Sequence, residues 1–139
     1  MSISMTIAFA CHLVGVLIGG AFGLVYLSRK RFMPYHAIAL GKEWDAVSSA
    51  VQVLILVLMR ATGGGLIAVA FLNLVLLLIP FRAGEVWAVW AIPLSNLMVS
   101  AGALYAMHIV SSNTPARPPK LFAIASILLT LTGLELSIL

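Results

Sequence analysis

Four polar side chains interrupt long apolar runs of this sequence and are its first candidates for chemistry: His12, Asn73, Asn96 and Glu135. Each is costly inside a membrane unless it is paired or hydrated. At about 1.5 Å per helical residue, His12 and the two asparagines fall at similar depths, with Glu135 several ångström shallower. One hypothesis is a polar cluster that binds a ligand or a partner, and the other is hydrogen bonding between helices alone. Glu135 has a further option, because it could reach the interface or pair with Arg82.

Arg60 is the second candidate, and it lies between an apolar run, Val53 to Met59, and a triple glycine, Gly63 to Gly65. In a continuous helix Gln52 and Arg60 lie within about 80° of each other, so they could line a polar cavity for an anionic head group or substrate. The alternative is an arginine that reaches the head groups as an anchor. The glycines favour a broken helix, a device with which transporters direct backbone groups at a ligand.

Tyr35, His36 and His108 form a third set of candidates, on the inner side of the spans. A haem between helices needs two axial histidines at one depth. His12 and His108 lie at different depths, and His36 lies in a connection that contains Pro34. The sequence also has no acidic pair, no Ser/His/Asp order, no HExxH and no Cys/His pair at zinc spacing. We therefore expect no catalytic residue, no metal and no cofactor.

The composition defines the elements that carry these candidates. Hydrophobic residues make up 63% of the 139 residues, charged residues make up 9%, and the mean hydropathy is +1.15. A soluble fold is excluded, because soluble domains contain about 25% charged residues. A membrane span needs about 20 apolar residues, so the chain has room for four. We expect an all-α integral membrane protein, a single antiparallel four-helix transmembrane bundle with spans at about 3–27, 46–80, 86–110 and 121–139.

The second span is long for one bilayer crossing and includes an extension on its inner side. As one helix it would measure about 50 Å, against a hydrocarbon core of about 30 Å. The helix must therefore be long, and tilt or protrude, or it must break near Gly63 to Gly65, where helix propensity is poor. A five-span alternative makes Ala46 to Met59 a separate short span.

Basic residues predict the direction of the spans. With the N-terminus outside the cytoplasm, seven of the eight lysines and arginines lie on the cytoplasmic side, and only Arg82 lies outside. The positive-inside rule therefore predicts two non-cytoplasmic termini, in the inner (plasma) membrane of a bacterial-type cell. We assign the net charge of +4 to this orientation and to anionic lipid head groups near Arg29, Lys30 and Arg31, and we expect no nucleic-acid partner.

Small residues predict how the helices pack. Gly15, Gly19 and Gly23 lie four apart, so they share one face on which a second helix can approach closely. Two small residues of the third span lie in a similar arc, Ser95 and Gly102. The glycine face packs either within the chain or between chains. On this interpretation Gly19→Leu damages assembly more than Gly20→Leu.

Three functional hypotheses follow. The first is a small membrane protein without covalent chemistry, acting as an accessory subunit or binding a lipid or small amphiphile. The second is a minimal oligomeric transporter, with the polar groups of the spans as gating or substrate groups. The third is a quinone- or haem-linked subunit of a membrane enzyme. The expected partners are membrane lipids, and either a second copy of the chain or a larger membrane complex.

Overall fold

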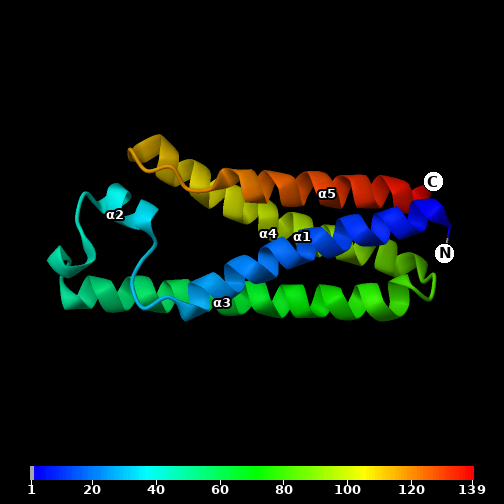
Figure 1. Cartoon of the computed structure of the whole chain (residues 1–139), viewed down its shortest axis with the longest axis horizontal. Helices are drawn as coiled ribbons and strands as arrows, with labels where there is room; N and C mark the ends of the chain where they lie inside the picture. The colour runs from blue at the N-terminus through cyan, green and yellow to red at the C-terminus, as the bar shows by residue number, and fades with distance from the viewer. Residues whose placement is uncertain (1) are drawn as a thin grey trace.

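The computed structural model describes residues 2–139, and these residues form helices and short connections (Figure 1). Four long helices run antiparallel: α1 (Ile3–Ser28), α3 (Ser49–Leu76), α4 (Val86–Asn113) and α5 (Lys120–Ile138). A π-helical segment, η2 (Leu77–Phe81), prolongs α3, and all four helices are long and apolar enough to cross a membrane. The predicted all-α membrane class and the four-helix bundle are confirmed.

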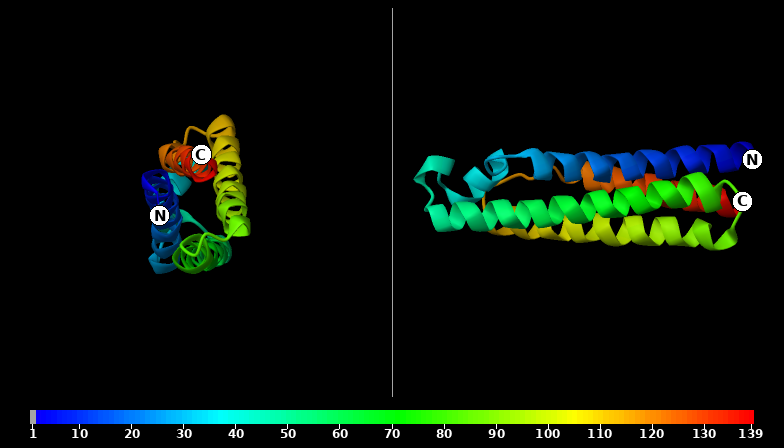
Figure 2. Two further views of the ribbon diagram at one scale, coloured as in Figure 1. Left: turned by 90° about the vertical axis from the view of Figure 1, so that its right-hand side faces the viewer. Right: turned by 90° about the horizontal axis from the view of Figure 1, so that it is seen from below.

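The two ends of the bundle differ. Both termini lie at one end, called here the terminal end, together with the turn between η2 and α4 (Figure 1). The opposite end, called here the connection end, holds residues 29–48, which join α1 to α3 and include α2 (Pro34–Leu40) and η1 (Trp44–Ala46). Because α3 begins farther from the terminal end than α1 finishes, the first turns of α3 extend beyond α1 (Figure 2).

The second membrane helix is continuous. α3 and η2 together form one apolar helix of 33 residues, without a break at the triple glycine. Of the options for the second span, the structure therefore has the long helix, and neither a break nor a separate short span. Gly63 is buried against α1, while Gly64 and Gly65 are exposed. The first of the three glycines thus permits close packing of two helices.

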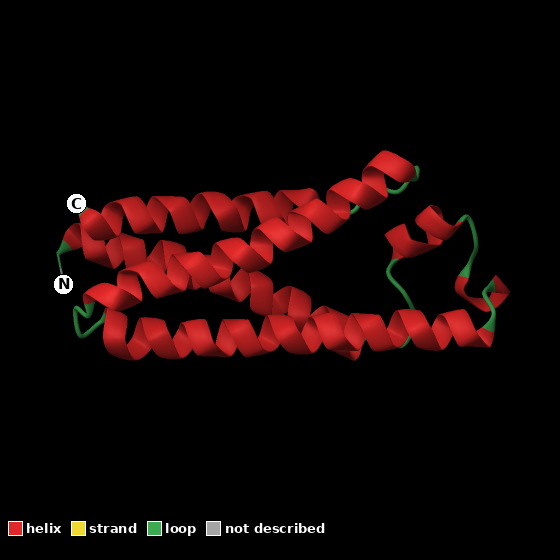
Figure 3. Ribbon diagram, turned by 180° about the vertical axis from the view of Figure 1, so that it is seen from behind, coloured by secondary structure: helices red, strands yellow, loops and turns green. Residues whose placement is uncertain are grey.

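The bundle is packed more closely at the terminal end. α1 contacts both α3 and α5 along much of its length, and α4 packs mainly on α5. A core of fully buried apolar side chains lies near the terminal end and includes Val16, Leu77, Phe81 and Ile92. Towards the connection end α4 diverges from α3 (Figure 3). In the connection half of the bundle, only side chains can fill the space between α3 and α4.

The glycine face of α1 is shared between different partners. At Gly15 an added β-carbon would lie 3.2 Å from Asn96 Nδ2 on α4, and at Gly23 it would lie 3.0 Å from the carbonyl oxygen of Gly63 on α3. At Gly19 an added β-carbon would meet no atom of residues 2–139 within 4 Å. Gly19 therefore does not pack closely against another helix within residues 2–139, because the stripe turns from α4 and α5 towards α3 along its length.

The same geometry corrects two related expectations. An added β-carbon at Gly20 would lie 3.4 Å from Ala70 Cβ, so a leucine is more crowded at Gly20 than at Gly19. The predicted order of damage for these two substitutions is therefore reversed. Gly102 is exposed, and a β-carbon there would meet nothing within 4 Å in the described chain, so Gly102 brings no two helices of this chain together.

The connection between α1 and α3 is held by hydrogen bonds to its own backbone. Gln52 Nε2 donates to the carbonyl oxygens of Trp44 and Val47, at 2.8 and 3.1 Å. Gly41 ends α2 in the left-handed region, with φ of 63°, a conformation that glycine adopts without a β-carbon clash. Gln52 therefore fixes the path of the chain into α3.

Candidate functional site: a groove between the helices

The polar residues predicted for the outer half form two hydrogen-bonded groups. In the first, Ser95 Oγ on α4 donates to Asn73 Oδ1 on α3 at 2.7 Å. In the second, Asn96 Nδ2 on α4 donates to Ser126 Oγ on α5 at 3.2 Å and to Thr130 Oγ1. Both asparagines are buried, so each ties two helices together inside the bundle.

The second group continues towards the connection end. Ser100 Oγ donates to Ser126 Oγ at 3.1 Å, and Ser126 Oγ lies 3.5 Å from the carbonyl oxygen of Gly15. The serine hydroxyls thus have partners inside the protein, as buried polar groups in a membrane require. Ser100 and Ser126 form a polar boundary across α4 and α5 about halfway along the bundle.

His12 stands apart from both groups. Its side chain is fully buried, and its ring meets Phe81 edge-on, with 5.8 Å between the ring centroids. An added β-carbon on Gly133 of α5 would lie 2.8 Å from His12 Cε1, so the imidazole occupies the space that this glycine leaves open. Neither ring nitrogen of His12, nor Asn73 Nδ2, has a hydrogen-bond partner among residues 2–139. A buried polar group without a partner costs roughly 2 kcal/mol or more.

The remaining candidates do not join these groups. Glu135 is exposed on α5, and the ion pair that the structure shows within residues 2–139 joins Arg31 to Asp45. Arg60 is exposed on α3, and Gln52 is engaged with the connection. The structure therefore does not bring Gln52 and Arg60 together around a cavity. His108 is also exposed, with Nε2 3.4 Å from Ser112 Oγ on the same helix.

A cavity of about 240 Å³ lies among all four long helices in the connection half of the bundle. Apolar side chains form most of its wall, with contributions such as Leu66 of α3 and Met107 of α4. Gly19 lines it, which explains why a β-carbon there would meet nothing. Ser100 and Ser126 lie at the side nearer the terminal end, and the hydroxyls nearer the connection end are those of Tyr26 and Thr62.

A second cavity, of about 350 Å³, lies between α2 and α3 and has Tyr26 and Thr62 in its wall as well. α2 contributes His36, Ala39 and Leu40 to this second cavity. The two cavities meet at Tyr26 and Thr62, and together they are called here the groove. No lysine, arginine, aspartate or glutamate lines the groove among the described residues.

The polar side chains at the connection end of the groove are neutral. The Tyr26 and Tyr35 hydroxyls form a hydrogen bond with each other. His36 Nδ1 accepts a hydrogen bond from the Met33 backbone N–H at 3.3 Å, so the proton of the neutral ring is on Nε2. Burial lowers the pKa of His36, and burial together with the hydrogen bond from Tyr26 raises the pKa of Tyr35. This end therefore offers uncharged hydrogen-bonding groups at neutral pH.

Among the groove residues, the sequence predicted His36 as a candidate; Tyr35, also predicted, lines neither cavity and is linked to the groove by its hydrogen bond with Tyr26. Tyr26, Thr62, Ser100 and Ser126 stand singly in apolar helices, where such residues usually serve packing. The position of Tyr26, two residues before the end of α1, was the available sequence signal, because it places a hydroxyl at the level of the connection.

The lowered pKa of His36 predicts a pH-dependent stability. The folded state disfavours the charged ring, so the stabilisation is complete above the ordinary histidine pKa of about 6.5 and is lost as the pH falls through the lowered pKa. His36→Gln keeps an acceptor for the Met33 N–H but does not titrate. We expect the melting temperature of the wild type to fall more steeply than that of His36→Gln below about pH 6.5. If the melting temperatures of the wild type and His36→Gln fell equally with pH below about 6.5, burial of a neutral His36 ring would be contradicted.

Other chemistry has no visible basis in the described chain. Within residues 2–139, no three His, Cys, Asp or Glu side chains gather where they could hold a metal ion. Cys11 is half-buried and free. No protein-family model, curated protein or solved structure matches the chain.

Proposed function

We propose that this protein binds a small neutral amphiphile in the groove. The polar group of the ligand lies at Tyr26 and His36, and its apolar part extends along α1, α4 and α5 towards Ser100. The cavity among the four helices is the observation that carries the proposal. The volume of about 240 Å³ and the mostly apolar wall suit the apolar part of a small amphiphile.

The lining defines the class of ligand. Because no charged side chain faces the groove, an ionic head group would be left unpaired there, at a large cost in free energy. Hydroxyl and imidazole N–H groups instead suit a carbonyl or hydroxyl head group. An isoprenoid alcohol or a quinone has this chemistry, whereas a phospholipid head group does not. Exposed lining residues such as Thr62 and Phe122 leave the groove open to the bilayer, from which such a ligand would enter.

The proposed orientation places the connection end, and with it the polar end of the groove, on the cytoplasmic side of an inner membrane. Arg29, Lys30, Arg31 and Lys42 support this orientation, because they all lie in the connection, whereas Arg82 lies in the turn at the terminal end. Both termini are then non-cytoplasmic. The protein acts in this proposal without covalent chemistry, by presenting or storing its ligand within the membrane.

Gly19→Leu tests the proposal, because a β-carbon at Gly19 meets no neighbouring helix and the new side chain would enter the cavity. Gly102→Leu is the matched control, since Gly102 is exposed on α4 and lines neither cavity. We expect the wild type and Gly102→Leu to co-purify one neutral amphiphile in stoichiometric amount, and Gly19→Leu to lose at least about tenfold of it, the effect of roughly 1.4 kcal/mol in binding.

The measurement is solvent extraction of each purified variant with quantification of the extract by mass spectrometry. Far-ultraviolet circular dichroism spectra of the three proteins serve as the folding control, and they should agree. Equal amounts of the same amphiphile in Gly19→Leu and wild type would place the ligand outside the cavity and overturn the proposal. The absence of any stoichiometric neutral amphiphile from the wild type would do the same.

A further inference from the structure

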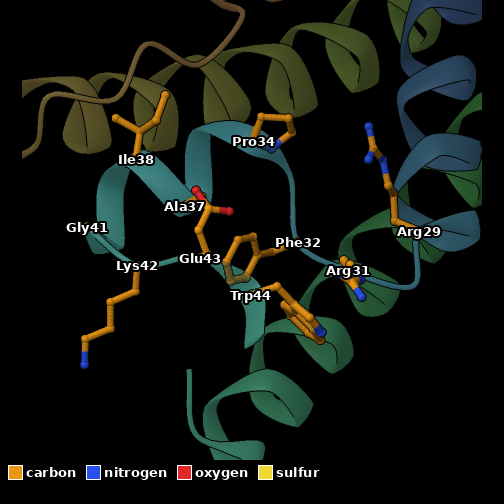
Figure 4. A pocket seen from close by; sticks show the side chains of 10 residues that line it. All are labelled: Arg29, Arg31, Phe32, Pro34, Ala37, Ile38, Gly41, Lys42, Glu43 and Trp44. Carbon is orange, nitrogen blue, oxygen red and sulfur yellow. The ribbon is translucent and has the colours of Figure 1, made fainter. Parts of the chain in front are cut away.

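A third cavity, of about 650 Å³, lies in the connection on the other side of α2 (Figure 4). None of the residues that line it also lines the groove. It begins at Arg29, directly after the last residue of α1, so it lies where a membrane-spanning helix reaches the head groups. The cavity is therefore a separate site, at the depth of lipid head groups.

The walls of this cavity carry charges of both signs. Arg29 and Arg31 contribute guanidinium groups, and Glu43 contributes a carboxylate. Arg31 Nη1 is 3.3 Å from Asp45 Oδ2, and both side chains are largely exposed, so this ion pair leaves other guanidinium donors available. Within residues 2–139, neither Arg29 nor Glu43 forms an ion pair. Figure 4 shows the Lys42 amine extending away from the other labelled side chains.

Aromatic side chains complete the cavity. Phe32 is buried, and its ring meets Trp44 edge-on with 4.9 Å between the centroids. Ile38 of α2 is exposed at the rim. The face of an aromatic ring attracts cations, and tryptophan attracts them most strongly.

We propose that this cavity binds the head group of an aminophospholipid, with the phosphate at Arg29 and Arg31 and the ammonium at Glu43 beside the aromatic pair. Guanidinium groups bind phosphate through paired, charge-assisted hydrogen bonds. A head group with negative charge alone would meet the unpaired Glu43 carboxylate, which repels it. A trimethylammonium has no N–H to donate to that carboxylate, so a primary ammonium fits best.

Delipidated protein in detergent, titrated in native mass spectrometry with phosphatidylethanolamine, phosphatidylcholine and phosphatidylglycerol of the same acyl chains, tests the proposal. We expect the wild type to bind phosphatidylethanolamine about tenfold more tightly than either other lipid, the effect of one charge-assisted hydrogen bond. Glu43→Gln should remove this preference, and Arg29→Gln should weaken binding of all three lipids.

Lys30→Gln is the matched control, because it removes the same charge from the same segment but Lys30 does not line the cavity. It should leave the preference for phosphatidylethanolamine unchanged, and unaltered melting temperatures should accompany each variant. Three results would overturn the proposal: tighter binding of phosphatidylglycerol by the wild type, an unchanged preference in Glu43→Gln, or equal effects of Lys30→Gln and Arg29→Gln. Equal effects of Lys30→Gln and Arg29→Gln would show that basic residues attract lipid non-specifically and that the cavity is not a binding site. If Glu43→Gln lowers the melting temperature, Glu43→Asp serves as the deciding variant. It keeps the carboxylate, so it should retain the preference for phosphatidylethanolamine, and loss of that preference would overturn the proposal.

Discussion

Gly63→Leu is expected to separate α1 from α3, whereas Gly64→Leu should leave the bundle intact. An added β-carbon on Gly63 would lie 2.8 Å from the Gly23 carbonyl oxygen, and 3.0 Å from side-chain atoms of Tyr26 and Leu27. A backbone oxygen cannot move aside without displacing its helix, so the two helices must part. Overpacking of this kind costs about 3 kcal/mol or more. The next residue, Gly64, is exposed, and its β-carbon would meet nothing within 4 Å in the described chain.

Thermal unfolding in detergent, followed by near-ultraviolet circular dichroism, measures this difference. Gly23→Leu should behave as Gly63→Leu does, because the contact is reciprocal. Both variants replace a glycine of α3 by leucine, so the change in helix propensity is the same in Gly63→Leu and Gly64→Leu. A difference between their melting temperatures therefore reports packing. Equal melting temperatures for these two variants would show that α1 and α3 do not approach as described.

Gly133→Ala is expected to destabilise the protein by about 2 kcal/mol, and removal of the His12 ring should suppress most of this loss. The new β-carbon would lie 2.8 Å from Cε1, 2.9 Å from Nε2 and 3.0 Å from Nδ1 of His12. His12 is fully buried beside Phe81, so the ring has no free space into which it can turn. In the His12→Ala background the same methyl group enters space that the imidazole has left.

A double-mutant cycle of His12→Ala and Gly133→Ala, measured by thermal unfolding, isolates this contact. His12→Ala alone opens a cavity but also removes two ring nitrogens without partners, so its own effect is the difference between two opposing contributions. The coupling between the two substitutions should be at least about 1 kcal/mol. Additive effects would mean that His12 does not lie against Gly133.

The membrane class and the four spans were predictable because both depend on the lengths of apolar runs. The predicted first span, residues 3–27, corresponds to Ile3–Ser28, and the second corresponds to one long helix. Periodicity could not show which partner each face of α1 meets. Gly15, Gly19 and Gly23 lie on one stripe, but α1 passes from α4 and α5 to α3, and Gly19 falls at the opening between them.

The candidate site was predictable only in part. His12, Asn73 and Asn96 are buried, as their cost in a membrane required, yet their hydrogen bonds depend on residues of the facing helices. Gln52 was placed with Arg60 by helical angle, but its amide reaches the backbone of the connection, whose path no periodicity describes. The cavity among the four helices lies where α4 diverges from α3, a property of the assembled helices.

Photo-crosslinking through methionine tests the groove most directly, because the chain already holds suitable methionines. Met107 lines the cavity among the four helices and Met59 lines the cavity beside α2, whereas Met98 is 69% exposed on α4 and faces the bilayer. Photo-methionine is incorporated throughout, the membranes are irradiated, and the adducts are assigned by peptide mass spectrometry. We expect one neutral adduct of a single mass at both Met107 and Met59, and a mixture of bulk lipids at Met98. The same mixture of bulk lipids at all three positions would contradict a defined ligand in the groove.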